Sequence, residues 1–256
     1  MTTTKPSKNI AVIITAAGSS VRMGGTKKEF LPLKNGTVLS SCAVAFLKSF
    51  ENTIPTKKNP TKDKNNGSSI KLLQNLVITI PEGMQEQAEK ALFCDKEFTS
   101  YKSCPLHFVT GSSTRQKSIF NALEFLRNQA FIPDYVLIHD GARPFVDTQT
   151  ILHVTNSTIE FGAAAPGFTP TDTIKEIDKD GFITRHLVRS NLISIQTPQG
   201  FEFERIFNAH QQAAKTAQEF TDDSEIWDKF CGKVKITQGN PSNKKITYPG
   251  DIDEEA

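Results

Sequence analysis

The sequence lacks the marks of several protein classes. Its 30 lysines and arginines nearly balance its 28 aspartates and glutamates, and a net charge of +2 gives no signature of a nucleic-acid-binding protein. No apolar run approaches the length of a membrane span. The four cysteines form no C-x-x-C pair, so we expect reduced thiols in the core and neither a disulfide framework nor a zinc site. They are Cys42, Cys94, Cys104 and Cys231.

The N-terminal stretch MTTTKPSKN has no apolar segment after its lysines, so we expect no secretory signal and a cytoplasmic protein. A length of 256 residues and a hydrophobic content of 37% are ordinary for a globular chain. We expect a single domain over residues 1–256, with a polar tail over residues 1–8. Residues 52–69 are rich in lysine, asparagine and proline, which predicts a solvated surface insertion.

Five apolar runs rich in β-branched residues predict strands that alternate with helical segments, a pattern typical of an α/β fold with a doubly wound, mainly parallel sheet. They cover residues 9–15, 75–80, 106–111, 135–140 and, more weakly, 161–168. Thr37 is placed to cap one helix, and Ser112 or Ser113 to cap another. Residues 201–217 have the apolar spacing of a further helix.

Residues 170–191 break this alternation. Apolar residues on both sides of Asp180 and Gly181 predict a β-hairpin that turns at these two residues. An isolated two-stranded ribbon is marginally stable in water, so the hairpin must pack against something. The sequence leaves two partners open, a second subunit or the rest of its own domain.

Three polar clusters each follow a predicted strand, over residues 16–28, 111–118 and 139–144. The carboxyl ends of parallel strands meet at one edge of a sheet, where such folds bind ligands. We therefore expect the three clusters to form one site.

The first cluster has the small residues of an anion-binding loop but neither standard phosphate-binding fingerprint. Small side chains over residues 16–20 let backbone N–H groups approach an anion, and Arg22 and Lys28 add the positive charge that phosphoryl chemistry requires. A surface loop with incidental cations is the alternative.

The other two clusters also suit a phosphorylated ligand. Asp140 ends a strand, where a carboxylate commonly holds Mg²⁺ against nucleotide phosphates, although an ion pair with Arg143 or a turn cap is the alternative. His139 suits packing or hydrogen bonding better than catalysis. Arg115 and Ser118 fall in the first turn of a helix, which favours an anion. The motifs QTPQGF and TDDS give no role beyond turn and helix-start chemistry.

Seven motifs, in order, resemble those of the 2-C-methyl-D-erythritol 4-phosphate cytidylyltransferases: AAGSSVRMG…KKEFLPL, GSSTRQKSIFNAL, HDGARPF, TDTIKE…VRSN, QTPQGF, TDDS and NKKIT. The resemblance covers residues 10–251. It implies a Rossmann-like nucleotidyltransferase domain with helices on both faces of the sheet and a protruding β-arm, about residues 170–190, that joins a homodimer. It also implies transfer of CMP from CTP to the phosphate of the acceptor, a polyol phosphate, with release of pyrophosphate and a need for Mg²⁺.

The resemblance implies a role for each matching residue. The nucleotide and its phosphates would be held by Ala16, Ala17, Gly18, Ser19 and, near the triphosphate, Lys245. The cytosine and ribose would lie against Gly111 and Ser118. Arg22 and Lys28 would stabilise the transition state, and Asp140 would coordinate the metal and also take part in binding the acceptor substrate. Arg143 would lie near the acceptor, which Thr173 and Arg189 would reach from the partner subunit.

The chain departs from the family pattern at four places. Lys27-Lys28-Glu29 replaces the usual Pro-Lys-Gln, so the alignment must decide which lysine is catalytic. Ser20 replaces a glycine and Gly141 an alanine. Ser242 replaces an acidic residue, so we expect no second metal carboxylate.

Two other functions share most of these motifs. A pentitol phosphate cytidylyltransferase, such as a ribitol 5-phosphate enzyme, would use the same loop and a different acceptor. A non-catalytic nucleotide-binding homologue would keep CTP binding without turnover.

Overall fold

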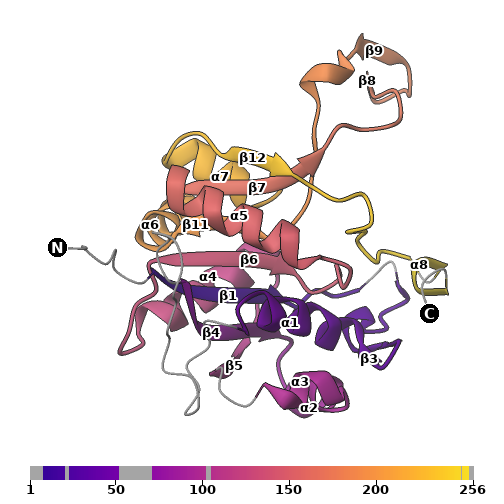
Figure 1. Cartoon of the computed structure of the whole chain (residues 1–256). Helices are drawn as coiled ribbons and strands as arrows, with labels where there is room; N and C mark the ends of the chain where they lie inside the picture. The colour runs from indigo at the N-terminus through magenta and orange to yellow at the C-terminus, as the bar shows by residue number, and fades with distance from the viewer. Residues whose placement is uncertain (1–7, 21–22, 52–70, 102–104, 249, 254–256) are drawn as a thin grey trace.

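An eight-stranded mixed sheet forms the centre of the computed structural model, which describes residues 8–20, 23–51, 71–101, 105–248 and 250–253 (Figure 1). The strand order is β10-β7-β11-β6-β1-β4-β5, and β12 also pairs with β7. The strands are β1 (Lys8–Thr15), β4 (Lys71–Ile80), β5 (Leu106–Thr110), β6 (Tyr135–Asp140), β7 (Ala163–Phe168), β10 (Ser194–Ile195), β11 (Gln199–Glu202) and β12 (Lys235–Gln238).

The five predicted strands all form, and the half of the sheet that carries β1 is parallel. β1 pairs in parallel with β4 on one side and with β6 on the other. The chain runs from β1 outward to β4 and β5, then returns to place β6 on the opposite side of β1. This reversal of strand order is the topological switch point at which open α/β sheets bind ligands. Thr15 and Asp140 are register partners there, at the last residues of β1 and β6.

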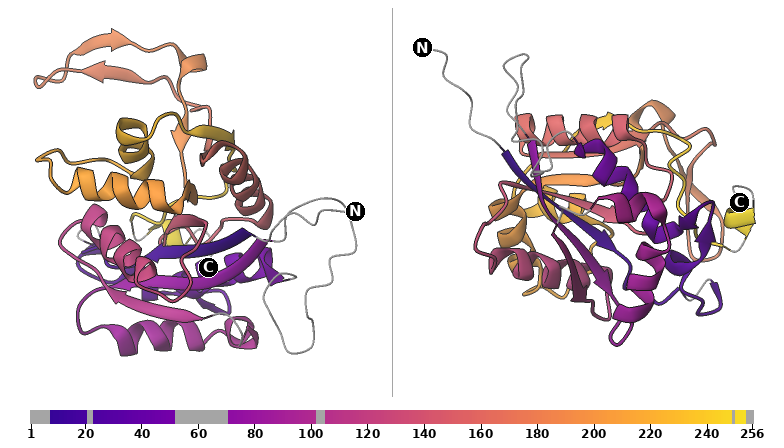
Figure 2. Two further views of the ribbon diagram at one scale, coloured as in Figure 1. Left: turned by 90° about the vertical axis from the view of Figure 1, so that its left-hand side faces the viewer. Right: turned by 60° about the horizontal axis from the view of Figure 1, so that its bottom comes forward.

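Helices pack on both faces of the sheet (Figure 2). In β1, Ile10, Val12 and Ile14 belong to one buried cluster and Ala11 and Ile13 to the other, as expected of a strand buried on both faces. The first cluster contains residues of α1 (Val38–Ser49), α2 (Gln85–Phe93), α3 (Lys96–Ser100) and α5 (Thr148–Phe161). The second contains residues of α4 (Arg115–Arg127), α6 (Phe203–Ala213) and α7 (Asp223–Phe230).

One predicted helix cap is confirmed and one is wrong. At α1 the Thr37 hydroxyl accepts from the Ser40 backbone N–H at 3.1 Å, and the Ser40 hydroxyl accepts from the Thr37 backbone N–H at 2.8 Å. At α4 the cap is Thr114, which accepts from the Lys117 N–H at 3.2 Å. Neither Ser112 nor Ser113 takes this role, because α4 begins at Arg115 and the residue before it is Thr114.

The predicted helix over residues 201–217 begins two residues later than expected. Its first residues belong to β11, which lies antiparallel between β6 and β7. Pairing within the sheet therefore overrides the helical spacing up to Glu202.

The cysteines lie in different environments. Cys42 is buried, as predicted, but Cys94 is exposed and Cys231 is only half-buried, so the expectation of core thiols is wrong for these two. Cys104 lies outside the described residues. All three described cysteines are free thiols.

The predicted hairpin forms a separate two-stranded sheet that stands away from the main sheet (Figure 1). β8 (Lys175–Ile177) pairs antiparallel with β9 (Ile183–His186). The turn closes through Gly181, whose φ of 87° lies in the left-handed region that glycine adopts without strain. Several large apolar side chains of this segment are exposed.

The remaining elements are short. They are η2 (Lys28–Phe30), β2 (Pro32–Leu33), β3 (Gly36–Thr37), η4 (Arg189–Asn191) and α8 (Gly250–Asp253). Residues 1–7 and 52–70, and with them the predicted tail and insertion, lie outside the described residues. Among the described helices, none has the length and apolar character needed to cross a membrane.

Candidate active site

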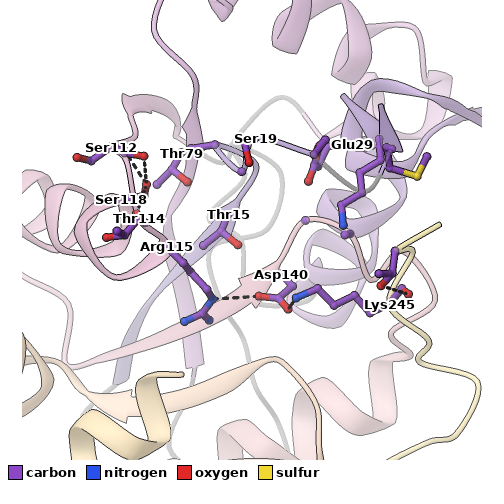
Figure 3. A pocket seen from close by; sticks show the side chains of 18 of the residues that line it. Thr15, Ser19, Glu29, Thr79, Ser112, Thr114, Arg115, Ser118, Asp140 and Lys245 are labelled. Carbon is purple, nitrogen blue, oxygen red and sulfur yellow. Dashed lines mark hydrogen bonds and ion pairs between the residues drawn. The ribbon is translucent and has the colours of Figure 1, made fainter. Parts of the chain in front are cut away.

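The three polar clusters meet at one cavity of about 540 Å³, at the carboxyl ends of β1 and β6 (Figure 3). Its walls include residues 17–20, residues 112–115, Asp140 and Lys245. Thr15, Ser19 and Thr79, which carry hydroxyl groups, also line the cavity (Figure 3). The prediction that the three strand-end clusters come together is confirmed.

Asp140 lies at the centre of the charges in this cavity. Its Oδ1 lies 3.3 Å from Nε of Arg115, and its Oδ2 lies 2.7 Å from Nζ of Lys245 and 3.9 Å from Nε of Arg143. Burial would raise the pKa of the Asp140 carboxyl, but these three cations outweigh it and hold the pKa well below its usual range. Asp140 is therefore ionised, and the ion pair with Arg143 that the sequence left open is present.

The glycine-rich loop reaches the cavity through residues 17–19. Ala16 is fully buried behind it, and its N–H donates to the Thr79 carbonyl at 2.9 Å. Ser20 adopts a φ of 51°, in the left-handed region, which explains why a glycine is usual here. Arg22, predicted as catalytic, lies outside the described residues.

The two lysines after the loop lie differently. Lys28 lines the cavity, and its Nζ donates to the Ile246 carbonyl at 2.7 Å. Lys27 does not line the cavity; its Nζ donates to the Gly18 carbonyl, within the loop. The structure therefore places Lys28, the lysine chosen by alignment, next to the site.

Glu29, the charge that departs from the family pattern, lines the cavity and is buried. Burial raises the pKa of its carboxyl, while a backbone hydrogen bond and the charge of Lys28 oppose the shift. Its Oε2 has no hydrogen-bond partner among the described residues. A neutral carboxyl at this place would resemble the glutamine of the family pattern in shape.

The β5–α4 loop is held by Ser118. Its hydroxyl accepts from the Ser112 N–H at 2.8 Å and donates to the Thr114 carbonyl at 2.9 Å. Gly111 does not line the cavity, but a Cβ there would lie 2.2 Å from that of Ala17. A larger residue at 111 would therefore displace the glycine-rich loop.

Thr173 and Arg189 are not brought into the cavity. Both are exposed near the hairpin, and the Arg189 guanidinium donates to the Thr173 hydroxyl at 3.2 Å. Arg143 lies behind the cavity and donates to the Asn243 carbonyl at 2.7 Å. Of the predicted acceptor-binding residues, only Asp140 lines the cavity directly.

The QTPQGF motif supports the site from behind. The Thr197 hydroxyl accepts from the Asp140 N–H at 3.1 Å and donates to Nδ1 of His139, 3.0 Å away. The Thr197 carbonyl accepts from the Asn243 side chain at 2.9 Å, and Gln196 donates to the Asn243 carbonyl at 3.1 Å. These bonds fix the segment that carries Lys245 against the end of β6.

Sequence analysis missed three contributors to this arrangement. They are Thr197, Asp223 and Asn243. All three lie in motifs already noted, QTPQGF, TDDS and NKKIT, so a signal was present. Their partners lie far away in the sequence, and the motifs alone gave no pairing.

Comparison with known proteins identifies relatives along nearly the whole chain. The model of the family described as 2-C-methyl-D-erythritol 4-phosphate cytidylyltransferase matches residues 61–255. A protein of that name from Clostridium botulinum is 33% identical over 245 residues, 95% of this chain and 96% of that protein. One from Clostridium beijerinckii is also 33% identical over 245 residues, with 95% of each chain covered.

A solved structure agrees with the sequence comparison. The crystal structure of 4-diphosphocytidyl-2C-methyl-D-erythritol synthase from Anaerococcus prevotii has a TM-score of 0.74 to this chain and is 26% identical. The match covers 97% of this chain and 96% of that one. The fold, with its helices on both faces of a mostly parallel sheet, is that of a nucleotidyltransferase, and the chain is an enzyme of this class. More narrowly, it belongs to the 2-C-methyl-D-erythritol 4-phosphate cytidylyltransferase family of isoprenoid biosynthesis.

Folding stability should fall in acid because of His139. Burial outweighs its hydrogen bond to the Arg143 carbonyl and lowers the pKa of His139 from 6.5 to about 4. The unfolded chain then binds a proton between pH 6.5 and 4 that the folded chain does not, so stability present above pH 6.5 is lost as the pH falls through this window. We expect this group to remove about 2 kcal/mol from the free energy of unfolding between pH 8 and pH 5, measured by urea denaturation.

The control is His139→Asn, which carries no titrating ring. This variant should be less stable than the parent at pH 8, but should lose about 2 kcal/mol less on transfer to pH 5. Equal losses in the two proteins would contradict a neutral, buried His139.

Proposed function

We propose that this cavity binds CTP and 2-C-methyl-D-erythritol 4-phosphate and joins them by direct displacement. An oxygen of the acceptor phosphate attacks the α-phosphorus of CTP and forms the new P–O bond. The bond from that phosphorus to the oxygen bridging to the β-phosphate breaks, and pyrophosphate leaves with the electron pair. The product is 4-diphosphocytidyl-2-C-methyl-D-erythritol.

One observation carries the proposal: the glycine-rich loop, Lys28, Asp140 and Lys245 border a single cavity at the switch point of the sheet. Backbone N–H groups of residues 17–19 would bind the phosphates. Lys28 and Lys245 would neutralise the charge that develops on the phosphate oxygens and on the leaving pyrophosphate. Arg22, from the same loop, is proposed to assist them. Ser118 would border the nucleoside, and Gly111 would leave room for Ala17 of the glycine-rich loop beside it.

Mg²⁺ is proposed to bind at Asp140. The residues fit the ion, because this carboxylate is ionised and its oxygens already form ion pairs with the cationic side chains of Arg115 and Lys245. Within the described part of the chain, no group of three or more His, Cys, Asp or Glu side chains could hold a metal by itself. Mg²⁺ commonly binds one carboxylate together with substrate phosphates, so the nucleotide would supply the other ligands. When bound, the ion would offset negative charge on those phosphates.

The activity is tested by pyrophosphate release from CTP and Mg²⁺, with methylerythritol phosphate and ribitol 5-phosphate in parallel. We expect turnover on methylerythritol phosphate. The family and its named relatives do not favour the pentitol alternative. Turnover on ribitol 5-phosphate alone would change the acceptor and keep the mechanism. Binding of CTP without turnover on either acceptor would support the non-catalytic alternative.

A pair of lysine variants tests the assignment in the first loop. Lys28→Ala should lower kcat by about two orders of magnitude or more, because it removes a preorganised charge from the cavity. Lys27→Ala should lower kcat much less, since Lys27 does not line the cavity. Steady-state pyrophosphate release measures both. Equal losses would show that the alignment at Lys27-Lys28-Glu29 is wrong.

The β8–β9 hairpin is proposed to act as a dimerisation arm. Ile177, Phe182 and Val188 are 65%, 72% and 63% exposed, which is unusual for large apolar side chains on a ribbon that is marginal by itself. A second copy of the chain would cover them. The same packing would bring Thr173 and Arg189 toward the acceptor site of the partner subunit, which explains why neither residue reaches the cavity of its own chain.

Replacing one arm residue tests the dimer. Phe182→Asp should convert a dimer into a monomer of 28.3 kDa in sedimentation velocity, because it places a charge in the proposed interface. Phe131→Asp is the matched control, since Phe131 is 74% exposed and lies between α4 and β6. The control should remain dimeric. A parent protein that turns over fully as a monomer would contradict the arm proposal.

The cytoplasmic location and the absence of nucleic-acid and membrane partners stay predictions from the sequence. The expectation of a single domain also stays a prediction.

A further inference from the structure

Arg115 connects the cavity to a carboxylate buried beneath it. It is the first residue of α4 and lines the cavity. Its Nε lies 3.3 Å from Oδ1 of Asp140, and one terminal nitrogen lies 2.8 Å from Oδ2 of Asp223. One guanidinium thus forms ion pairs with two carboxylates, which a planar group with several nitrogens can do and a lysine ammonium matches poorly.

Asp223 is held firmly from the side away from the cavity. Its side chain is 0% exposed, and its Oδ1 lies 3.1 Å from Nε2 of His210 on α6. Asp222 caps α7 and accepts from the Gln199 side chain at 2.8 Å, while the Ser224 N–H donates to the same side chain at 3.0 Å. The TDDS motif and the second glutamine of QTPQGF therefore fix where Asp223 lies.

The charges show what this connection does. The pKa of Arg115 is raised, because the charges of Asp223 and Asp140 outweigh the effect of burial, so it stays protonated. Asp223 offsets the positive charge of Arg115. The guanidinium then contributes less net charge to the cavity than Lys245 does, and its main effect on Asp140 is on the position of the carboxylate.

We propose that Arg115 is a positioning residue, held by buried Asp223, that fixes Oδ1 of Asp140 and leaves Oδ2 to meet the exchangeable cations of the cavity. This inference rests on the proposed function, because it assigns Asp140 a role in binding the nucleotide and its cation. It gives the TDDS motif a purpose: its second aspartate does not line the cavity and acts through Arg115.

The two oxygens of Asp140 differ in a way that supports this division. Oδ1 pairs with a side chain that is anchored at its far end. The nearest cation to Oδ2 is Lys245, at 2.7 Å, whose side chain is 38% exposed and ends in a single ammonium, while Arg143 lies farther from this oxygen, at 3.9 Å. An anionic ligand can draw Lys245 away without disturbing Arg115. Oδ2 is therefore the oxygen from which one cation can leave and on which another can bind.

The experiment compares Arg115→Gln, the double variant Arg115→Gln/Asp223→Asn and the control Arg127→Gln. The single change leaves the buried carboxylate of Asp223 without its guanidinium partner, and it risks unfolding the protein. The double variant removes both charges of the pair, so its midpoint temperature of thermal unfolding should be close to that of the parent. Arg127 lies on the same helix in an exposed ion pair with Glu204, so its loss should have little effect.

Two readouts are measured on the intact proteins: kcat from pyrophosphate release, and CTP affinity by calorimetry in the presence of Mg²⁺. In the double variant we expect kcat to fall 10- to 100-fold, the usual effect of losing a group that orients a ligand-binding side chain. CTP affinity should weaken about tenfold. The control should match the parent in both.

A folded double variant with the kcat and CTP affinity of the parent would overturn the proposal, since Arg115 would then serve stability alone. A parent that shows no turnover on either acceptor would instead count against the proposed function. In that case the calorimetric comparison still decides the role of Arg115, because it needs no acceptor.

Discussion

The ion pairs of the Asp140 carboxylate are the interaction on which the rest of the site depends. A lone buried carboxylate costs several kcal/mol, and here the cost is offset by Arg115, Arg143 and Lys245. Lys245 lies 105 residues away in the sequence. The carboxylate therefore joins α4, the end of β6 and the segment before α8. Since the proposed chemistry uses these groups, the stability of this corner and its activity are coupled.

The sequence was sufficient to predict the parallel part of the sheet, because each strand there is a continuous apolar run. Ile10 to Ile14 had to be buried on both faces, and the structure buries them so. It was also sufficient to place the site, since three polar clusters followed strands whose carboxyl ends must meet. Hydrophobic periodicity and strand direction follow from neighbouring residues, so the predictions made from them hold in the folded chain.

The remainder could not be predicted, because it consists of side-chain bonds across long stretches of sequence. Nothing in QTPQGF shows that Thr197 binds Asp140 and His139, and nothing in TDDS shows that Asp223 binds Arg115. The antiparallel strand β11 was hidden for a related reason. Its residues continue the apolar spacing of α6, and only pairing with β6 and β7 makes them a strand.

The cations of the site share one property that bears on how it works. Lys28 donates to the Ile246 carbonyl and Lys245 to Asp140. Each ammonium is thus already partly withdrawn from water and held by an oxygen of the chain. A phosphate oxygen that takes over Lys28 or Lys245 replaces one oxygen partner with another, so little reorganisation accompanies the change. Charges held in place in this way stabilise a transition state better than charges that must first be gathered from solvent. Anchoring the lysines to the protein therefore prepares the cavity for a polyphosphate.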